Sequence, residues 1–492
     1  MEYFEITHRD AMGRIAKLET PHGVIETPTL MPVINPNIEF ISASEMKKFG
    51  ADMVITNSYI IYRTPSLRDV ALEKGVHGLL DTDLAVMTDS GSYQLMVYGG
   101  VEVNNREIVE FQKAIGSDIA VPLDIPTPPD SVLSLAEEDL STTVERESEA
   151  AELFKGEKAL LAIPIQGSTH PELRRKSASI AVRIAEETGI RAVFPIGAVV
   201  PLLDTYRFAD VARIVLEAKS VLPAWAPVHL FGAGHPMLFA LAVALGCDLF
   251  DSAAYALYAK DDRYLTPYGT KKLNELHYFP CSCPVCSKYT PEELRGMKKS
   301  ERARLIAEHN LYVCFEEIRT IKQAIKENTL FELVEKRIRS HPYLIAAWRL
   351  LKEERYAKLM EMLDAGMKQT FFYTGIESVY RPAVVRHAER VKQVELEGRE
   401  FIISTNLLEQ ADFYLRPAFG IVPAELIESY PAGHAELPPA EYIEGEALEV
   451  AVRHLVDFLS HHSDKKFRIM VEDVWRPYIK DLPQNATLEP ME

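Results

Sequence analysis

Two carboxylates stand at the ends of apolar segments, where the chain would otherwise read as buried strand. Asp89 closes the run VMTD before a Ser-Gly-Ser turn, and Asp251 closes LFD before Ser-Ala. Two carboxylates at one site suit displacement at an anomeric carbon, because one can attack the carbon while the other handles the proton of the leaving group. The pair therefore predicts glycosyl chemistry with retention of configuration.

Further polar groups end apolar segments at Asn57, Asp124, Gln166 and Gly197. One such residue often only caps the next helix, but six of them that converge on one edge predict a binding site. Asp124, Gln166 and the backbone amide of Gly197 offer hydrogen bonds that could read the edge of a purine. Tyr93 follows the Ser-Gly-Ser turn, where it could stack on a planar base or simply belong to the core.

The same carboxylate pair also fits a retaining glycoside hydrolase. Such enzymes usually present exposed aromatic platforms to sugar rings. The three tryptophans are Trp225, Trp348 and Trp475, and only Trp225 lies among the apolar segments, ahead of its strand. Transfer to or from a base is therefore favoured over sugar hydrolysis.

A second group of chemically active residues is the motif PCSCPVC. Cys281, Cys283 and Cys286 form CxCxxC, a strong signal for a zinc site in a reducing compartment. The spacing leaves two candidates for a fourth ligand, His309 and His277. Four protein ligands close the coordination shell to water, so the Zn²⁺ is expected to be structural.

An alternation of short apolar segments and amphipathic stretches must position these residues. Stretches such as NREIVEFQKAIG and HPMLFALAVALG repeat apolar residues at helical spacing. Eight strand–helix units predict an α/β fold, a (β/α)₈ barrel whose active site lies at the C-terminal ends of the strands. FEITHRDAMGRIAKLETPHGVIETP is expected to form a hairpin over the barrel floor. The eight apolar segments are LMPVI from Leu30, 53–58, 86–90, 119–125, 160–167, 192–198, 227–234 and 248–253.

The 492 residues suffice for two or three domains, and 47% hydrophobic with 26% charged residues is typical of a soluble globular protein. We expect a catalytic barrel with its hairpin over 1–270, a zinc-binding subdomain with closing helices over 271–365, and a smaller α+β domain over 366–492. A net charge of −18 argues against nonspecific coating of nucleic acid. With no signal peptide and no long apolar run, we expect a cytoplasmic protein.

Seven motifs, in order over roughly residues 4–350, resemble the archaeal tRNA-guanine transglycosylase family. The resemblance implies a glycosyltransferase that replaces guanine at position 15, in the D-loop of tRNA, with 7-cyano-7-deazaguanine (preQ0). This exchange is the first step of archaeosine biosynthesis, and related enzymes serve queuosine synthesis. A homodimer is implied as well. The motifs are TDSGSYQL, LDIPTPPD, IQGS, PIGAVVP, HLFGAGHP, LFDSAAYALYAKDDRY and YFPCSCPVCSKYTPEEL.

The same resemblance implies a role for each catalytic residue. Asp251 matches the nucleophile that attacks ribose C1′ and forms a covalent enzyme–tRNA intermediate. Asp89 matches the general acid/base that protonates the leaving guanine and deprotonates the incoming base. The matching base-binding residues are Ser90, Tyr93, Asp124, Gln166, Gly197 and Ala198, and the matching zinc ligands are Cys281, Cys283, Cys286 and His309.

Two departures from the family pattern are visible. Ala198 stands where archaeal members usually have glycine, so its methyl group would narrow the base pocket. Beyond about residue 367 the chain resembles the family's intermediate C-terminal region but has no recognisable PUA module, so a separate PUA-type RNA-binding chain is an expected partner. A catalytically silent tRNA-binding subunit is the further alternative; loss of an aspartate or a cysteine would favour it, and all are present.

Basic residues near the proposed nucleophile are expected to contact the ribose-phosphate chain of tRNA. They are Lys260, Arg263, Lys271 and Lys272.

Overall fold

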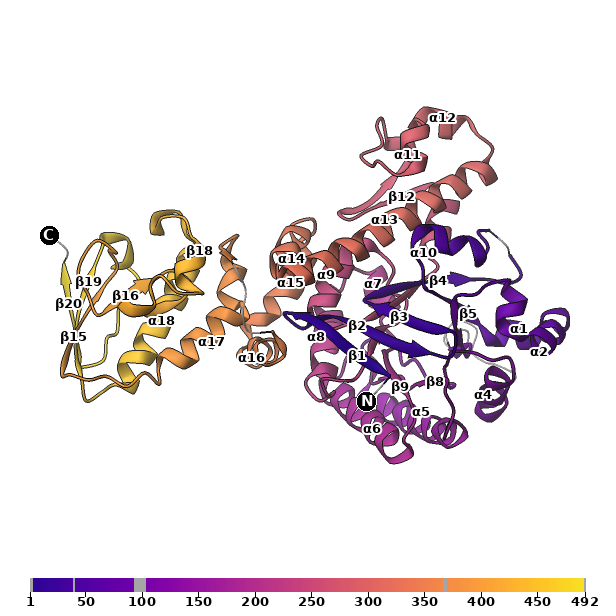
Figure 1. Cartoon of the computed structure of the whole chain (residues 1–492), viewed down its shortest axis with the longest axis horizontal. Coiled ribbons are helices and arrows are strands. Elements are labelled where there is room, and N and C mark those ends of the chain that lie inside the picture. Colours follow the sequence, from indigo (N-terminus) through magenta and orange to yellow (C-terminus); the bar gives the residue numbers. More distant parts are fainter. Residues whose placement is uncertain (1–2, 39, 93–102, 366–369, 491–492) are drawn as a thin grey trace. The chain divides into compact units, whose positions relative to one another are not determined.

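The structure is a computed structural model of the chain and describes all residues except 1–2, 39, 93–102, 366–369 and 491–492 (Figure 1). The chain divides into two compact units, residues 1–350 and 351–492. Every residue of the predicted catalytic and zinc sites falls within the range of the first unit. The finer division into three parts, at 270 and 365, stays a prediction.

The first unit contains the predicted barrel. Its eight strands pair in parallel and close in the order β10-β11-β4-β5-β6-β7-β8-β9. Each overlaps one of the eight predicted segments, and β4 and β6 each begin one residue before theirs. The (β/α)₈ prediction is therefore confirmed. The strands are β4 (Thr29–Ile34), β5 (Met53–Asn57), β6 (Ala85–Asp89), β7 (Ile119–Ala120), β8 (Leu160–Ala162), β9 (Ala192–Ile196), β10 (Val228–Leu230) and β11 (Leu249–Ser252).

Helices surround the barrel (Figure 1), and several of them begin at a capping residue or at a proline in the first turn. Helix α4, for example, opens with a capping box in which Asn104 and Glu107 satisfy each other's backbone N–H groups, and α6 ends at Gly189 in the left-handed conformation. The described helices of this layer are α1 (Ser58–Arg63), α2 (Pro65–Leu80), α4 (Asn105–Ala114), α5 (Leu133–Leu153), α6 (Pro171–Thr188), α7 (Val200–Asp204), α8 (Phe208–Lys219), α9 (Pro236–Ala244) and α10 (Ala254–Lys260).

The expected N-terminal hairpin is a three-stranded antiparallel sheet. It comprises β1 (Phe4–Asp10), β2 (Gly13–Thr20) and β3 (Gly23–Thr27). The Tyr3 hydroxyl bonds both backbone groups of Ala192, the first residue of β9, and Arg14 pairs with buried Asp248 just before β11 at 2.6 Å. Because both contacts reach the N-terminal ends of barrel strands, the sheet covers the end opposite the predicted active site.

A third contact at the same end joins three distant segments. Asp118, just before β7, accepts hydrogen bonds from the imidazoles of His22 and His77, each at 2.9 Å, and the two rings stack with centroids 3.6 Å apart. The backbone N–H of Val86 also donates to this buried carboxylate, at 2.7 Å. These bonds hold the pKa of Asp118 below its usual value despite its burial.

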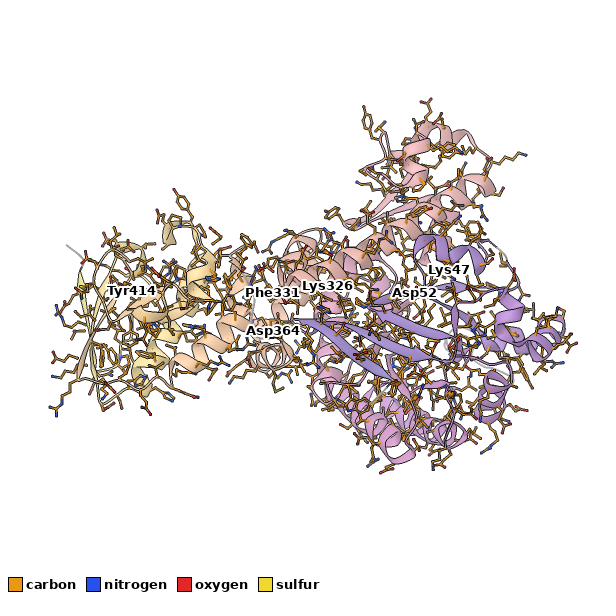
Figure 2. The ribbon with its side chains drawn as sticks, viewed as in Figure 1. Lys47, Asp52, Lys326, Phe331, Asp364 and Tyr414 are labelled. Carbon is orange, nitrogen blue, oxygen red and sulfur yellow. The ribbon has the colours of Figure 1, made fainter. Side chains whose placement is uncertain are left out.

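After the barrel, the first unit continues with a hairpin and helices that contact it. The ring of Phe331, labelled in Figure 2, is fully buried and meets Trp348 edge to face with centroids 4.9 Å apart. The elements are β12 (Arg263–Thr266), β13 (Gly269–Lys272), α11 (Pro284–Lys288), α12 (Pro291–Gly296), α13 (Lys299–Glu327), α14 (Leu330–Ile338) and α15 (Pro342–Trp348).

The second unit is an α+β fold with its own hydrophobic core. A five-stranded sheet in the order β17-β16-β15-β19-β20 packs with helix α18, and only β17 runs antiparallel to its neighbour. Its elements are α16 (Glu354–Leu363), β14 (Phe371–Phe372), α17 (Pro382–Val391), β15 (Glu400–Ser404), β16 (Phe413–Arg416), β17 (Gly420–Pro423), β18 (Ala435–Glu436), α18 (Gly445–His461), β19 (Lys466–Val471) and β20 (Ala486–Pro490). In the described part of both units, no helix is long and apolar enough to cross a membrane.

Candidate active site and metal centre

The predicted carboxylates end strands at one mouth of the barrel. Asp89 is the last residue of β6, and Asp251 lies near the end of β11. Asp124 follows β7, and Gln166 follows β8. Because parallel strands of a barrel present their C-terminal ends at the same face, these side chains come from four strands to one edge.

Asp251 is fixed by two donors on a single oxygen. Its Oδ1 accepts a hydrogen bond from Nε2 of His229 and another from the backbone N–H of Gly232, both at 2.8 Å. The side chain remains 14% exposed. This arrangement holds the carboxylate by one oxygen and directs the other away from those two donors.

Asp89 is influenced by two other carboxylates. Burial, followed by repulsion from Asp124 and Asp251, raises its pKa from 3.8 to about 7, although backbone N–H groups of the next two residues partly oppose the shift. Nδ2 of Asn57 donates to its Oδ2 at 3.0 Å. Near neutral pH, Asp89 can therefore either give or take a proton, which a general acid/base requires.

Asp124 and Gln166 form a second polar pair. Nε2 of Gln166 donates to Oδ2 of Asp124 at 2.5 Å, and both side chains are buried. Burial raises the pKa of Asp124, and hydrogen bonds from Ser92 and Gln166 moderate the rise. Oε1 of Gln166 is buried and meets no hydrogen-bond partner in the described structure, so it can accept one from a bound molecule.

The end of β9 approaches this pair closely. A Cβ atom on Gly197 would lie 2.2 Å from Nε2 of Gln166, so only glycine leaves room for that amide. The N–H of Gly197 already donates to the carbonyl of Ile165 at 3.2 Å. Ala198 adopts φ of 58°, a left-handed conformation that favours glycine. Of the two amides predicted to read a base, the structure therefore commits Gly197 to Ile165.

Ser90 and Tyr93 are the two remaining predicted base-binding residues. The hydroxyl of Ser90 is buried, donates to the carbonyl of Pro122 at 2.9 Å and contacts the hydroxyl of Ser92 at 2.9 Å. Ser90 thus supports the loop that follows β6. Tyr93 lies outside the described residues.

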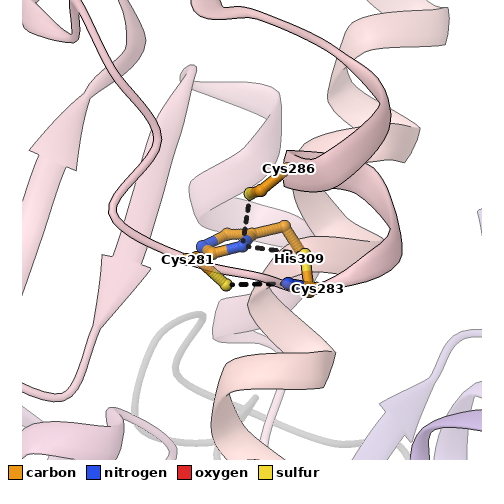
Figure 3. Close-up of side chains that lie close together, drawn as sticks. All are labelled: Cys281, Cys283, Cys286 and His309. Carbon is orange, nitrogen blue, oxygen red and sulfur yellow. Dashed lines mark hydrogen bonds between the residues drawn. The ribbon is translucent and has the colours of Figure 1, made fainter.

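The predicted metal ligands also come together (Figure 3). Nδ1 of His309 lies 3.3 Å from Sγ of Cys286 and 3.5 Å from Sγ of Cys283. These atoms and Sγ of Cys281 all lie within 4.8 Å of one another. The alternative ligand, His277, is exposed and does not belong to this group.

The surroundings of His309 fit a metal ligand. Its Nε2 lies 2.9 Å from the carbonyl of Leu265, so Nε2 carries the proton and Nδ1 presents its lone pair to the three cysteines. The ring stacks on Tyr264 with centroids 3.6 Å apart, and the Tyr264 hydroxyl contacts Sγ of Cys286 at 3.3 Å. Three sulfurs and one nitrogen in this arrangement can bind a metal ion, and the donor set suits zinc.

The basic residues expected to guide a phosphate chain differ in availability. Lys271 and Lys272 are exposed on β13. The Arg263 guanidinium instead lies 3.7 Å from the ring centroid of Tyr258 and pairs with Asp261 at 3.5 Å. The two lysines are thus the more accessible cations of this set.

His229 was missed by the sequence analysis. It lies inside the apolar strand VHL, where a histidine reads as one more core residue. Its side chain is fully buried, and only the structure reveals that it contacts Asp251. A histidine within an otherwise apolar barrel strand was the available signal.

Known proteins with similar sequences were found along almost the whole chain. A family described as queuine tRNA-ribosyltransferase matches residues 10–343. A tRNA-guanine(15) transglycosylase of Archaeoglobus fulgidus is 64% identical over 488 residues, covering 99% of each chain. Proteins of the same name match from Methanosarcina mazei, with 51% identity over 99% of this chain and 97% of the relative, and from Methanocaldococcus jannaschii, with 49% identity over 93% of this chain and 72% of the relative.

Proposed function

Because the chain belongs to the queuine tRNA-ribosyltransferase family, we propose that it exchanges the guanine at position 15 of tRNA for a free base. The observation that carries this proposal is the unlike environment of its two strand-end carboxylates. Asp251 is held by two hydrogen-bond donors, while the pKa of Asp89 rises to about 7. One carboxylate is thereby suited to attack and the other to proton transfer.

The exchange proceeds by two displacements at ribose C1′. Oδ2 of Asp251 attacks C1′, the bond from C1′ to the guanine nitrogen breaks, and protonated Asp89 gives its proton to the leaving base. The incoming base then loses a proton to ionised Asp89 and attacks C1′, and the ester bond to Asp251 breaks. Both carboxyl groups return to their starting states, so no external energy source is needed.

The buried pair of Asp124 and Gln166 supplies base recognition. Asp124 can accept hydrogen bonds from the N–H groups of a guanine edge, and its partner Gln166 offers a buried oxygen with no described partner. The Ala198 amide is a further donor, and Tyr93 is proposed as the stacking residue. We propose 7-cyano-7-deazaguanine as the incoming base because it shares this edge with guanine.

Cys281, Cys283, Cys286 and His309 are proposed to hold a zinc ion. When bound, the ion links the segment around α11 to helix α13 and plays no part in the displacement, because four protein ligands leave no open position. A homodimer, which the family resemblance implies, stays a prediction.

The test is incorporation of labelled 7-cyano-7-deazaguanine into an unmodified tRNA transcript by the purified protein. We expect incorporation that disappears when the guanosine at position 15 is replaced. On a denaturing gel, the unsubstituted protein should retain a tRNA adduct under conditions that trap it. Asp89→Asn should form this adduct more slowly because the leaving base lacks its acid, and Asp251→Asn should form none. An adduct that persists in Asp251→Asn but vanishes in Asp89→Asn would reverse the two roles, and absence of any incorporation would refute the proposed function.

A further inference from the structure

His229 contacts the proposed nucleophile and takes no direct part in the two displacements. It lies in the middle of β10 with a fully buried side chain, and its ring meets Phe231 edge to face with centroids 4.6 Å apart. Its Nε2 lies 2.8 Å from Oδ1 of Asp251, on the adjacent strand β11. A buried histidine that faces a reacting carboxylate is either a packing residue or part of the apparatus that orients it.

The hydrogen bonds determine the protonation state of the ring. A carboxylate only accepts, so Nε2 of His229 must carry the proton that the bond to Asp251 uses. The opposite nitrogen, Nδ1, is buried and meets no hydrogen-bond partner in the described structure. A second proton there would be a buried donor with nothing to accept it, which disfavours the imidazolium form. The contacts on its two nitrogens thus favour the neutral, Nε2-protonated tautomer of His229.

The geometry also distinguishes the two oxygens of Asp251. The N–H groups of His229 and Gly232 both point to Oδ1, whereas neither reaches Oδ2. Two donors from different directions on one atom stop the carboxylate from rotating. Gly232 makes its bond from a left-handed backbone, at φ of 69°, and a Cβ there would lie 2.4 Å from Val200. His229 within β10 and Gly232 in the loop after β10 thus both place a donor at Oδ1.

We propose that His229 is a positioning residue that holds Asp251 by Oδ1 and leaves Oδ2 as the atom that attacks ribose C1′. The inference rests on the proposed function and adds to it the residue that orients the nucleophile. When Oδ2 forms its bond to C1′, Oδ1 becomes the carbonyl oxygen of the ester and keeps both donors. When the incoming base displaces the ester, the same donors receive the returning charge. Because the ring is neutral, it stabilises the carboxylate without protonating it.

The test compares two substitutions at one position. His229→Gln places an amide N–H near the location of Nε2, whereas His229→Leu removes the donor and keeps an apolar side chain. We expect the Leu variant to lower the single-turnover rate of covalent tRNA attachment by about 100-fold, as for a misplaced reacting group. The Gln variant should restore most of that rate, and the KM for tRNA should stay within about threefold in both. Thermal unfolding of each variant provides the measure of structural damage.

The outcomes separate the role of His229 from the proposed function itself. Equal losses in the Gln and Leu variants, in step with equal losses of thermal stability, would show a packing residue and overturn the inference. An unchanged rate in the Leu variant would overturn it as well. Absence of exchange by the unsubstituted protein would instead overturn the function on which the inference rests.

A spectroscopic measurement reports the state of the ring in the unsubstituted protein. In a protein labelled with ¹⁵N-histidine, the signals absent from the spectrum of His229→Gln identify His229. We expect those signals at pH 7 to be those of a neutral ring protonated at Nε2. The signature of an imidazolium, or of the Nδ1-protonated tautomer, would contradict the proposed hydrogen bond.

Discussion

The carboxylate of Asp251 helps to raise the pKa of Asp89, although two strands, β4 and β5, separate their own strands in the barrel. Burial is the largest cause of that rise, Asp124 adds the larger share of the repulsion and Asp251 the smaller. Asp89 therefore keeps a proton up to near neutral pH. This coupling leads directly to a pH dependence of the reaction.

Release of guanine should slow as pH rises through about 7. The leaving base takes its proton from Asp89, and the protonated fraction of a group with a pKa of about 7 falls about tenfold for each further unit of pH. The measurement is release of labelled guanine from tRNA in a single turnover with excess enzyme, between pH 5.5 and 9. A rate that stays constant or increases across this range would contradict the acid role of Asp89.

Asp89→Asn should stabilise the fold while it impairs the reaction. The pKa of Asp89 is higher in the folded chain than in the unfolded one, so stability is fully present below about pH 4 and is lost as pH rises through about 7. The neutral amide avoids this loss, which gives about 2–4 kcal/mol in the free energy of unfolding at pH 8. Chemical denaturation of both proteins at pH 5 and pH 8 tests the sign, because the gain should be clearly smaller at pH 5.

The barrel could be predicted from the sequence because its parallel strands are short apolar runs between amphipathic helices. The lengths of the strands could not. The segment 119–125 pairs in the barrel only over Ile119–Ala120, because Pro122 lacks an N–H and the side chain of Gln112 satisfies both backbone groups of Val121. Where a side chain satisfies backbone groups in place of a neighbouring strand, the sequence carries no periodic pattern that reveals it.

The candidate site, too, could be predicted from the sequence only in part. Asp89 and Asp251 were visible because a carboxylate that ends an apolar run is unusual. The use of each backbone amide was not visible, and the N–H of Gly197 proves to be bonded to Ile165. Likewise, His229 could be distinguished from a core histidine only by its distance to Asp251, which depends on the register of two neighbouring strands.

Loss of one cysteine ligand should remove the metal and destabilise the segment around α11. We expect about one zinc ion per chain in the unsubstituted protein and much less in Cys283→Ser, because a hydroxyl is a poor substitute for a thiolate. Elemental analysis measures the zinc, and limited proteolysis reports the local destabilisation. Ser282→Ala, a change at the exposed residue between two of the ligands, should keep both properties. Full zinc content in Cys283→Ser would exclude that residue as a ligand.

Gly197→Ala should weaken binding of the base without weakening binding of tRNA. The new methyl group would lie 2.2 Å from Nε2 of Gln166, which is fully buried and bonded to Asp124, so that amide must move. Loss of a buried hydrogen bond costs about 1–3 kcal/mol, which predicts a KM for guanine raised about 5- to 150-fold. Backbone conformation is not the obstacle, because Gly197 is not among the residues with positive φ.

A matched control separates this steric effect from a general cost of replacing glycine. In Gly296→Ala the new Cβ meets no atom within 4 Å, so guanine exchange should be unchanged. The KM for guanine in guanine exchange and the Kd for tRNA in filter binding are measured for both variants. If Gly197→Ala keeps the normal KM for guanine, then the position of Gln166 does not matter to the base, and the proposed reading of guanine by the pair of Gln166 and Asp124 is wrong. If instead the KM rises while the Kd for tRNA stays constant, base recognition resides in that pair and is separable from the grip on the nucleic acid.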